Sequence, residues 1–598
     1  MVKYIIVISL ILGQAYSSNA QHNEDLIRLA RLHGVALFVL EDKEMEDLVL
    51  QKIFQVYHNN DSIDFNVAIE RLIPKDPNRD YTIIDTTGLL LVSEPYKLID
   101  DTIFGRSNRK RLEALILGTK NGSAKKTDNK EVRIIDYKDN PSFEDGLDSM
   151  HVLRSYMRLW SGINFQYPYK DRLPRDWDST FYDYLPRFIS DSSTEYHVYT
   201  NSLLALSKEI NDGHISLEKH YSKEEFKAHE KLHKRAEKQA KKAAKDDHEH
   251  EHNESAEEKR NIKLPPLALV GDINGLYVSK IFECEQTKGI RKGEKVLSVN
   301  GLSMDEIIAK YGQDTAFQRR ELTALQFDNS MFWTRLGGGD TLMLRFEGKD
   351  EEQLFVREMM SYDEFYEYYY PETKVQIPES EDVVYLSLGE RDKKAFKSAV
   401  KKATKEGKPL IIDARQYPSK LFMALWPRYL SNKAKPVSEI YLPLKNYPGF
   451  YKKQEKLSYF FTSQTDLVLK ALRVLPMDAR LFYPLAKQIK SPIVVLIDES
   501  TKSWGETATM VFDEYGEDRL TIIGRRTAGA NGNVGAIVLA GRKEFTFTHL
   551  KLNDYRGVNY QHIGYPPDIY VEEKIDPEHP ESDLILMTAL DFLRKREQ

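Results

Sequence analysis

The sequence predicts a multidomain α/β protein, and three patterns along its 598 residues carry that prediction. Strand-like and helical segments alternate between residues 383 and 577, the stretch from 147 to 216 is mainly helical, and a β pattern returns from residue 266. Short β-branched runs separated by crossover helices predict a mainly parallel sheet with helices on its faces. Hydrophobic residues make up 41% of the chain, so several cores are expected.

The first twenty residues have the features of a secretory signal peptide. Lys3 precedes an apolar run, and small residues ending at Ala20 form a cleavage site before Gln21. We therefore expect residues 1–20 to direct export to the periplasm or the extracellular space. The apolar run is too short to cross a bilayer, and no later segment reaches the ~20 apolar residues that a spanning helix needs. The net charge of −6 argues against a nucleic-acid partner.

The next two regions differ in how much they predict. Residues 21–146 mix helix and strand signals without a chemical motif, so we expect an N-terminal α/β region with no assigned role. Residues 147–218 form a predicted helical domain, in which a second helix is expected over 196–210. The tripeptide Asn211-Asp212-Gly213 ends that helix, because glycine is a common helix terminator. His214 follows this tripeptide directly.

Residues 219–264 are nearly all charged and predict a solvated insertion or linker. Three histidines in it, His248, His250 and His252, suggest metal binding as an alternative. Acidic spacers without a rigid frame give poor ligand geometry, so no metal or other cofactor is expected. The single cysteine, Cys284, cannot form an intramolecular disulfide and gives no nucleophile pattern.

The remaining two domains are a β module over residues 265–350 and an α/β core over residues 351–598. In the core, a buried strand pattern at 493–497 breaks, and helical sequence resumes around Ser503. This serine therefore lies beyond the carboxyl end of a strand, where α/β sheets place their sites.

Two interpretations compete for Ser503. Its hydroxyl suits a nucleophile, because unpaired N–H groups at a helix N-terminus stabilise the oxyanion of acyl transfer. It also suits an ordinary cap, because Glu506 three residues later completes a capping box. Taken alone the segment favours the cap, which is common. The rest of the chain favours the nucleophile.

Six segments, taken in order, resemble one enzyme family: INDGHISL (210–217), IRKGEKVLSVNG (290–301), LIIDARQYPS (410–419), ESTKSWGE (499–506), GRRTAGANGNV (524–534) and YQHIGYPPDI (560–569). The family is that of the tail-specific, or C-terminal processing, serine peptidases. The resemblance implies a helical N-terminal region, an inserted PDZ-like β module and a crotonase/ClpP-like α/β catalytic core. It also implies an exported serine endopeptidase of the secreted bacterial type, with polypeptide substrates.

The same segments distinguish the two branches of that family. In the serine–lysine branch a lysine follows T-x-G, and here Ala530 stands in its place. The wording TAGANGNV resembles the tricorn-like branch, in which a histidine upstream of the PDZ module is the base, and the matching residue is His214. That branch has an acidic residue before its G-x-x-PD-I motif, where this chain has Gln561. The resemblance thus implies Ser503 as nucleophile, His214 as base and Gln561 as the group that orients the base.

Backbone groups complete the site that the resemblance implies. The oxyanion would be bound by the N–H of Trp504 and by one from the loop after Arg415, of which Ser419 is the named candidate. That loop lacks the usual glycines of the family. In the PDZ-like module, Gly275, Leu276, Tyr277 and Val278 are the expected binding loop for a peptide's terminal carboxylate.

Each assignment has a structural alternative. His214 suits a helix C-terminus, where a histidine interacts with the dipole. Gln561 suits an ordinary loop amide, and Arg415 suits an ion pair with a carboxylate. The altered sites also leave open an inactive protein that binds peptides or apolar ligands on the same fold. A metal-handling protein based on the histidine-rich insertion is the third alternative.

Overall fold

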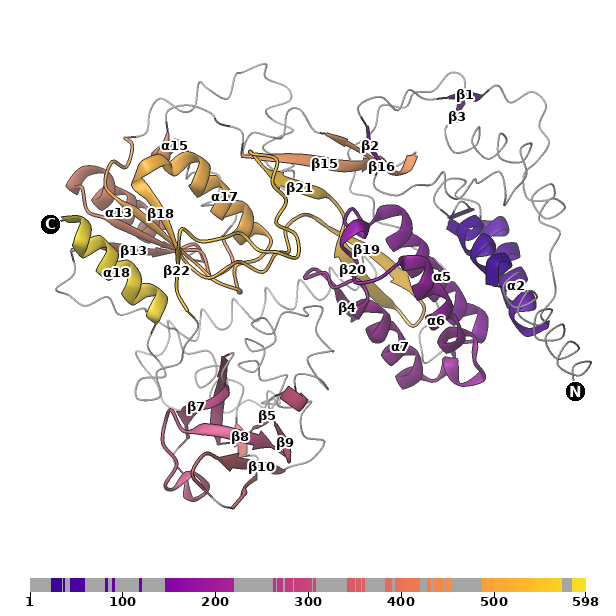
Figure 1. The fold of residues 1–598 in the computed structure, drawn as a ribbon, viewed down its shortest axis with the longest axis horizontal. Helices are drawn as coiled ribbons and strands as arrows, with labels where there is room; N and C mark the ends of the chain where they lie inside the picture. Colours follow the sequence, from indigo (N-terminus) through magenta and orange to yellow (C-terminus); the bar gives the residue numbers. More distant parts are fainter. Residues whose placement is uncertain are drawn as a thin grey trace, which may run out of the picture.

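The computed structural model describes the chain in separated stretches, and Figure 1 shows their arrangement. The described residues are 23–34, 36–37, 43–59, 81–83, 89–91, 118–120, 146–219, 262–264, 266–272, 275–282, 284–303, 305–307, 341–349, 351–356, 358–360, 382–389, 393–419, 427–431, 435, 437–444, 447–453, 487–572 and 583–597. The predicted signal peptide and nearly all of the histidine-rich insertion lie outside them.

A five-stranded parallel sheet forms the centre of the C-terminal half. Its order is β13-β14-β17-β18-β22, and every neighbouring pair is parallel. The strands are β13 (Val384–Ser387), β14 (Leu410–Asp413), β17 (Ile493–Ile497), β18 (Leu520–Gly524) and β22 (Ile569–Tyr570). The sequence predicts β13, β14, β17 and β18 as strands but not β22, and the prediction of a mixed α/β fold is confirmed.

Helices cover both faces of this sheet (Figure 1). Alternate residues of β17 face opposite sides, because side chains along a strand alternate. Val495 packs into the core that includes α17 (Trp504–Gly516) and α13 (Lys393–Lys401), and Val494 packs into the core that includes α18 (Leu584–Glu597). Two short helical pieces, α15 (Pro427–Leu430) and η10 (Glu517–Arg519), complete this part of the described chain.

Two antiparallel sheets extend from this core toward the helical domain. The first has the order β2-β16-β15-β21, with bounds Leu89–Leu91, Tyr447–Lys453, Ser438–Leu444 and Lys551–Asp554. The second has the order β19-β20-β4, with bounds Val534–Leu539, Lys543–Thr548 and Ser216–Lys219. Strand β4 directly follows the helical domain in the chain, so the second sheet joins that domain to the C-terminal α/β core.

The helical domain consists of α5 (Ser149–Gln166), α6 (Trp177–Ile189) and α7 (Tyr196–Lys208), with short 3₁₀ turns at Lys170–Arg172 and Asp191–Thr194. Tyr156 and Trp160 of α5 are completely buried and stack on or pack edge-on against aromatic rings of α6. Phe545 and Phe547 of β20 belong to the same core. The helical domain and the second antiparallel sheet are therefore one packed unit.

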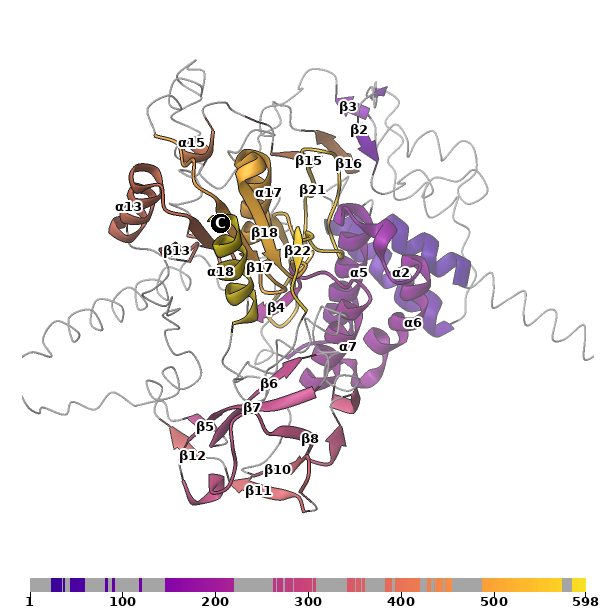
Figure 2. The same ribbon diagram turned by 60° about the vertical axis from the view of Figure 1, so that its left-hand side comes forward.

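Helices of the N-terminal region pack against α5, as Figure 2 shows for α2 (Lys43–Asn59). Glu46 of α2 and Arg158 of α5 form a buried ion pair with an Nε–Oε1 distance of 2.8 Å. The pKa of Glu46 is lowered to about 2, because hydrogen bonds and charges from His33 and Arg158 outweigh its burial. Two strands of this region, β1 (Tyr81–Ile83) and β3 (Gly118–Lys120), pair with each other.

The chain forms a separate β module after the helical domain and before the C-terminal α/β core. Its main sheet has the order β11-β10-β8-β7-β6, with β9 paired to β8. The bounds are β6 Leu267–Asp272, β7 Gly275–Ile281, β8 Lys295–Val299, β9 Leu302–Ser303, β10 Thr341–Phe346 and β11 Gln353–Val356, with a 3₁₀ turn at Glu285–Thr287. Strands β5 (Ile262–Leu264) and β12 (Glu358–Met360), which begin and end the described part of the module, pair with each other. It has its own core.

Strand pairing brings His214 to the end of β20. In the antiparallel β4–β20 pair, Ser216 lies opposite Thr546. Continuing this register by two residues in each strand places His214 opposite Thr548. A register of two strands thus joins residues that are 334 positions apart in the chain.

Candidate active site

Ser503 has an unusual backbone conformation at the start of α17. Its φ is 54° and its ψ is −113°, a region that residues other than glycine rarely adopt. An ordinary N-cap has an extended backbone and a side-chain bond to the helix, but Ser503 has neither. Such strain costs about 1–3 kcal/mol and is concentrated at functional sites. The geometry therefore disfavours the capping interpretation and leaves the hydroxyl unused by the helix.

Glu506 fixes the loop that faces Ser503. Its buried carboxylate accepts hydrogen bonds from Thr527 Oγ1 and from the backbone N–H groups of Gly529 and Ala530. The carbonyl of Ala530 in turn accepts the N–H of Ser503, at 2.9 Å. Burial raises the pKa of Glu506 to about 7, although these donors oppose the shift. The glutamate predicted as half of a capping box is thus an anchor for the 527–530 loop.

His214 lies in the loop between α7 and β4, with a side chain that is 8% exposed. Its Nδ1 is 2.8 Å from Thr548 Oγ1, and its backbone N–H donates to Asp212 Oδ1. Burial lowers the pKa of His214, the Asp212 charge opposes this, and the Lys502 charge adds to it. Lys502 directly precedes Ser503, so the imidazole of His214 is close enough to this segment to be affected by its charge.

Gln561 contacts both halves of the site. Its Oε1 accepts the N–H of Asn531 at 3.0 Å, and its Nε2 donates to Thr548 Oγ1 at 3.3 Å. Gln561 is expected to orient the base, but its carbonyl accepts from Asn531 and not from the ring of His214. The connection to His214 runs through the Thr548 hydroxyl instead. Ser503, the 530–531 segment, Gln561, Thr548 and His214 therefore form one continuous hydrogen-bonded series.

The two backbone N–H groups predicted to bind the oxyanion, those of Trp504 and Ser419, differ in their surroundings. Trp504 is the first residue of α17, so its N–H belongs to the helix N-terminus beside Ser503. The N–H of Ser419 instead donates to the carbonyl of Leu388, at 2.9 Å. Ser419 is therefore wrong as an oxyanion donor in this conformation. Arg415 forms ion pairs with Asp413 and Asp583, which supports its structural interpretation.

The site residues Ser503 and Gln561, and the loop between them, fall inside one family match. Residues 436–571 match the model of peptidase family S41. This stretch of the chain is therefore similar to peptidase family S41. The match supports the serine-type peptidase that the sequence predicts, with polypeptide substrates.

Several solved structures are similar to the chain at low sequence identity. Mature CPAF is 14% identical with a TM-score of 0.48, and the match covers 74% of this chain and 96% of that one. The photosystem II D1 C-terminal processing protease is 14% identical with a TM-score of 0.32, covering 73% and 95%. The tricorn protease is 12% identical with a TM-score of 0.33, covering 75% and 37%. No curated protein sequence matches the chain.

The residues predicted as a carboxylate-binding loop form part of a strand instead. Residues Gly275–Val278 begin strand β7, which lies between β6 and β8 in the sheet. The N–H of Val278 donates to the carbonyl of Glu294. A strand with neighbours on both sides uses its backbone groups in the ladder, so these residues do not form an open cradle for a carboxylate.

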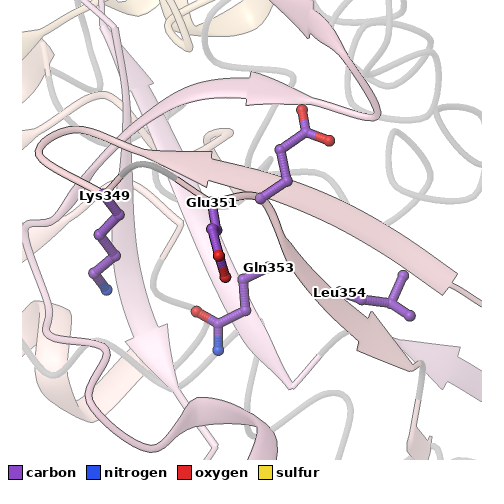
Figure 3. A pocket seen from close by; sticks show the side chains of 5 residues that line it. Lys349, Glu351, Gln353 and Leu354 are labelled. Atoms are coloured by element: carbon purple, nitrogen blue, oxygen red, sulfur yellow. The ribbon is translucent and has the colours of Figure 1, made fainter.

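A surface hollow lies elsewhere on the β module, near the turn between β10 and β11 (Figure 3). Its lining consists of Lys349, Glu351, Glu352, Gln353 and Leu354, none of which belongs to the Ser503 site. Among the described residues no cluster of histidine, cysteine or carboxylate side chains is suited to a metal ion. His248, His250 and His252 lie outside the described residues. No described helix is long and apolar enough to cross a membrane.

Two polar residues of the site escape the sequence analysis. Asp212 appears there only as part of a helix-ending tripeptide, and Thr548 only as part of a strand. Both are completely buried, and they bond to each other through Asp212 Oδ1 and Thr548 Oγ1 at 2.7 Å. The spacing of Asp212 two residues before His214 is the one signal that pointed to it.

Gln561→Ala tests whether this amide supports the site. We expect kcat to fall by one to two orders of magnitude, which corresponds to roughly 1.4–2.8 kcal/mol of transition-state stabilisation. The N–H of Asn531 and the hydroxyl of Thr548 each lose a partner, so the loop and His214 are both less fixed. Steady-state kinetics with a peptide substrate, and a melting curve for each protein, measure the effect. Equal kinetics for the two proteins would remove Gln561 from the site.

Proposed function

We propose that this chain is an exported serine endopeptidase of the tricorn-like branch, with Ser503 as nucleophile and His214 as general base. The single observation that carries the proposal is the strained backbone of Ser503, which presents an uncapped hydroxyl at a helix N-terminus. The strained backbone of Ser503 is held in place by surrounding contacts, which Glu506 and Ala530 supply. A strand-to-helix turn of this kind is the geometry that exposes catalytic serines in other hydrolases.

The chemistry follows from these positions. His214 Nε2 takes the proton of Ser503 as the serine oxygen attacks the scissile carbonyl carbon, and the carbonyl electron pair moves onto the oxygen. The N–H of Trp504 supports that oxyanion. The imidazolium then gives its proton to the leaving amine as the peptide bond breaks. Water repeats the same steps on the acyl-enzyme and restores the free serine.

Electrostatics of the site favour His214 in the neutral form that this role needs. Burial and the Lys502 charge both lower its pKa from the ordinary value of 6.5. A lowered pKa means that the imidazole stays neutral at pH values where a free histidine would be partly charged. The base is therefore ready at neutral pH without any prior loss of a proton.

Labelling with a fluorophosphonate probe tests the proposal directly. We expect the purified protein to gain one probe adduct on Ser503, located by peptide mass spectrometry. The acidic limb of the labelling rate should have its midpoint below pH 6.5, because burial lowers the pKa of His214. A midpoint above pH 6.5 would contradict His214 as the base.

The matched control is the Ser503→Ala protein, which should take up no probe under the same conditions. Absence of labelling in the wild-type protein would instead favour an inactive peptide-binding protein, and the engaged N–H of Ser419 is the observation that favours this second candidate.

Substrate recognition and export belong to the same proposal. The β module is expected to bind an unstructured C-terminal peptide by strand addition, which needs an open sheet edge. Strands β6 and β11 lie at the two edges of its described sheet and supply such an edge. The signal-like sequence at residues 1–20 supports export to the periplasm or the extracellular space.

A further inference from the structure

The hydroxyl of Thr548 is the point where three polar side chains of the site meet. Its Oγ1 lies 2.8 Å from His214 Nδ1, 2.7 Å from Asp212 Oδ1 and 3.3 Å from Gln561 Nε2. Asp212 also accepts the backbone N–H of Thr548 and that of His214. Thr548 and Asp212 are completely buried, so water does not compete for these bonds. A hydroxyl in this position has one proton to donate and two lone pairs to offer.

Donor counting fixes the direction of each bond. The Asp212 carboxylate can only accept, so Thr548 donates its single proton to Asp212. The amide nitrogen of Gln561 can only donate, so it uses one lone pair of Thr548. The remaining lone pair accepts from His214 Nδ1, which must then carry the ring proton. His214 Nε2 is left unprotonated.

The surroundings of Nε2 agree with this assignment. That atom is buried and has no hydrogen-bond partner within the described part of the chain. A neutral imidazole with its proton on Nδ1 and a free lone pair on Nε2 is the tautomer that a general base needs. In the structure, the tautomer follows from the contacts of Thr548 rather than from any contact of Gln561 with the ring.

We propose that Asp212 and Thr548 are positioning residues for His214: the carboxylate, acting through the threonine hydroxyl, holds the catalytic tautomer and stabilises the imidazolium that forms during attack. This inference rests on the proposed roles of Ser503 and His214. In this proposal the carboxylate that stabilises the imidazolium is that of Asp212, two residues before His214. Position 561, where the resemblance implies an acidic residue, has the amide of Gln561.

Two features make Asp212 suitable for this role. Its Oδ1 lies 3.9 Å from His214 Nδ1, close enough for a direct charge interaction with the imidazolium. Its carboxylate is held in place by hydrogen bonds from Thr548 Oγ1 and from two backbone N–H groups. No proton passes through Thr548: His214 keeps its Nδ1 proton, and the proton gained on Nε2 leaves with the amine.

Other charged groups also influence the pKa of His214 or interact with Asp212. Lys502 acts on His214 from the segment before α17. The Asp212 charge also acts on His562, where it opposes the lowering of the pKa by burial, and the Arg172 charge adds to that lowering. At His214 the Asp212 charge favours the imidazolium and the Lys502 charge opposes it, so removal of Asp212 should be visible in a pH profile.

Thr548→Val is the first test, because valine has the shape of threonine without the hydroxyl. We expect the kcat/KM for a peptide, and the fluorophosphonate labelling rate, to fall roughly 100-fold, since His214 loses the acceptor that holds its tautomer. Thr548→Ser restores a hydroxyl and should recover most of the lost rate. Thr180→Val makes the same change at a completely buried threonine of α6, whose hydroxyl bonds only to Asp176 of its own helix turn, and should leave the rate unchanged.

Asp212→Asn supplies a readout that a purely structural role would not move. Removing the negative charge should lower the apparent pKa of the acidic limb of kcat/KM, as well as the plateau, because the imidazolium loses its stabilising partner. A residue that only supports folding would lower the melting temperature and leave that limb in place. If Thr548→Val fails to fold, Asp212→Asn still tests whether these residues position His214.

The possible outcomes separate the two proposals. If the wild-type protein is not labelled at Ser503, the proposed function fails and this inference fails with it. If the wild-type protein is labelled, but Thr548→Val reacts at the same rate, or folded Asp212→Asn shows an unmoved pH limb, the inference alone is overturned. Loss of rate in Thr548→Val, recovery in Thr548→Ser and a shifted limb in Asp212→Asn support it.

Discussion

Ser503→Ala and His214→Ala should each lower kcat for peptide hydrolysis by roughly 10⁴-fold or more, the largest effects expected for this chain. In the proposed mechanism the serine oxygen forms the bond to the substrate and the histidine takes its proton, so neither works without the other. The double variant should therefore be little slower than either single one. Single-turnover kinetics with a fluorogenic peptide, at matched protein concentrations, measure these losses.

Matched controls are available in the same domain. Ser207→Ala removes a hydroxyl that bonds only within α7, and His197→Ala removes a histidine whose side chain is 72% exposed. Both should retain wild-type kcat. If His214→Ala also retained it while Ser503→Ala did not, the base would lie elsewhere and the tricorn-like assignment would be wrong.

Glu506→Gln should lower the free energy of unfolding by about 2–3 kcal/mol and kcat/KM by roughly 100-fold. The two carboxylate oxygens of Glu506 accept from Thr527, Gly529 and Ala530. A glutamine has only one oxygen, so in either orientation its NH₂ group faces a buried N–H donor. The loop then moves away from Ser503, whose N–H bonds to Ala530. Urea unfolding and peptide kinetics on the same preparations measure both effects.

The pH dependence of this effect has a definite sign. The pKa of Glu506 is raised from 4.5 to about 7 in the folded protein, so the folded state keeps a proton that the unfolded chain has lost. Its contribution to stability is therefore full below pH 4.5 and is lost as the pH rises through 7. Glu506→Gln should remove this slope from the pH dependence of the free energy of unfolding. An unchanged slope in Glu506→Gln would contradict the pKa assigned to this group.

The elements of the catalytic core follow from local sequence. Strands β14, β17 and β18 appear where β-branched runs predict them, because their side chains are buried on both faces and leave no polar alternation. The position of Ser503 after β17 follows from the same pattern. Whether that serine caps the helix does not, because its positive φ depends on contacts with Ala530 and the 527–530 loop.

The remaining part of the site depends on contacts between distant segments. Ser419 and Gly275 were predicted from motif position, but the use of their backbone groups is set by neighbouring segments, Leu388 for one and the flanking strands of β7 for the other. Asp212 and Thr548 meet only because β4 and β20 pair in one particular register. Sequence patterns describe single segments well and do not specify such pairings.

The pairing of β4 with β20 also has a consequence for how the protein is made. A growing chain contains His214 long before it contains Thr548, which lies 334 residues further on. Ser503 likewise emerges before the strand that completes the base. A chain that ends before Thr548 therefore contains Ser503 and His214 but lacks the strand that holds the imidazole. If these residues have the proposed roles, the protein is expected to be inactive during most of its own synthesis.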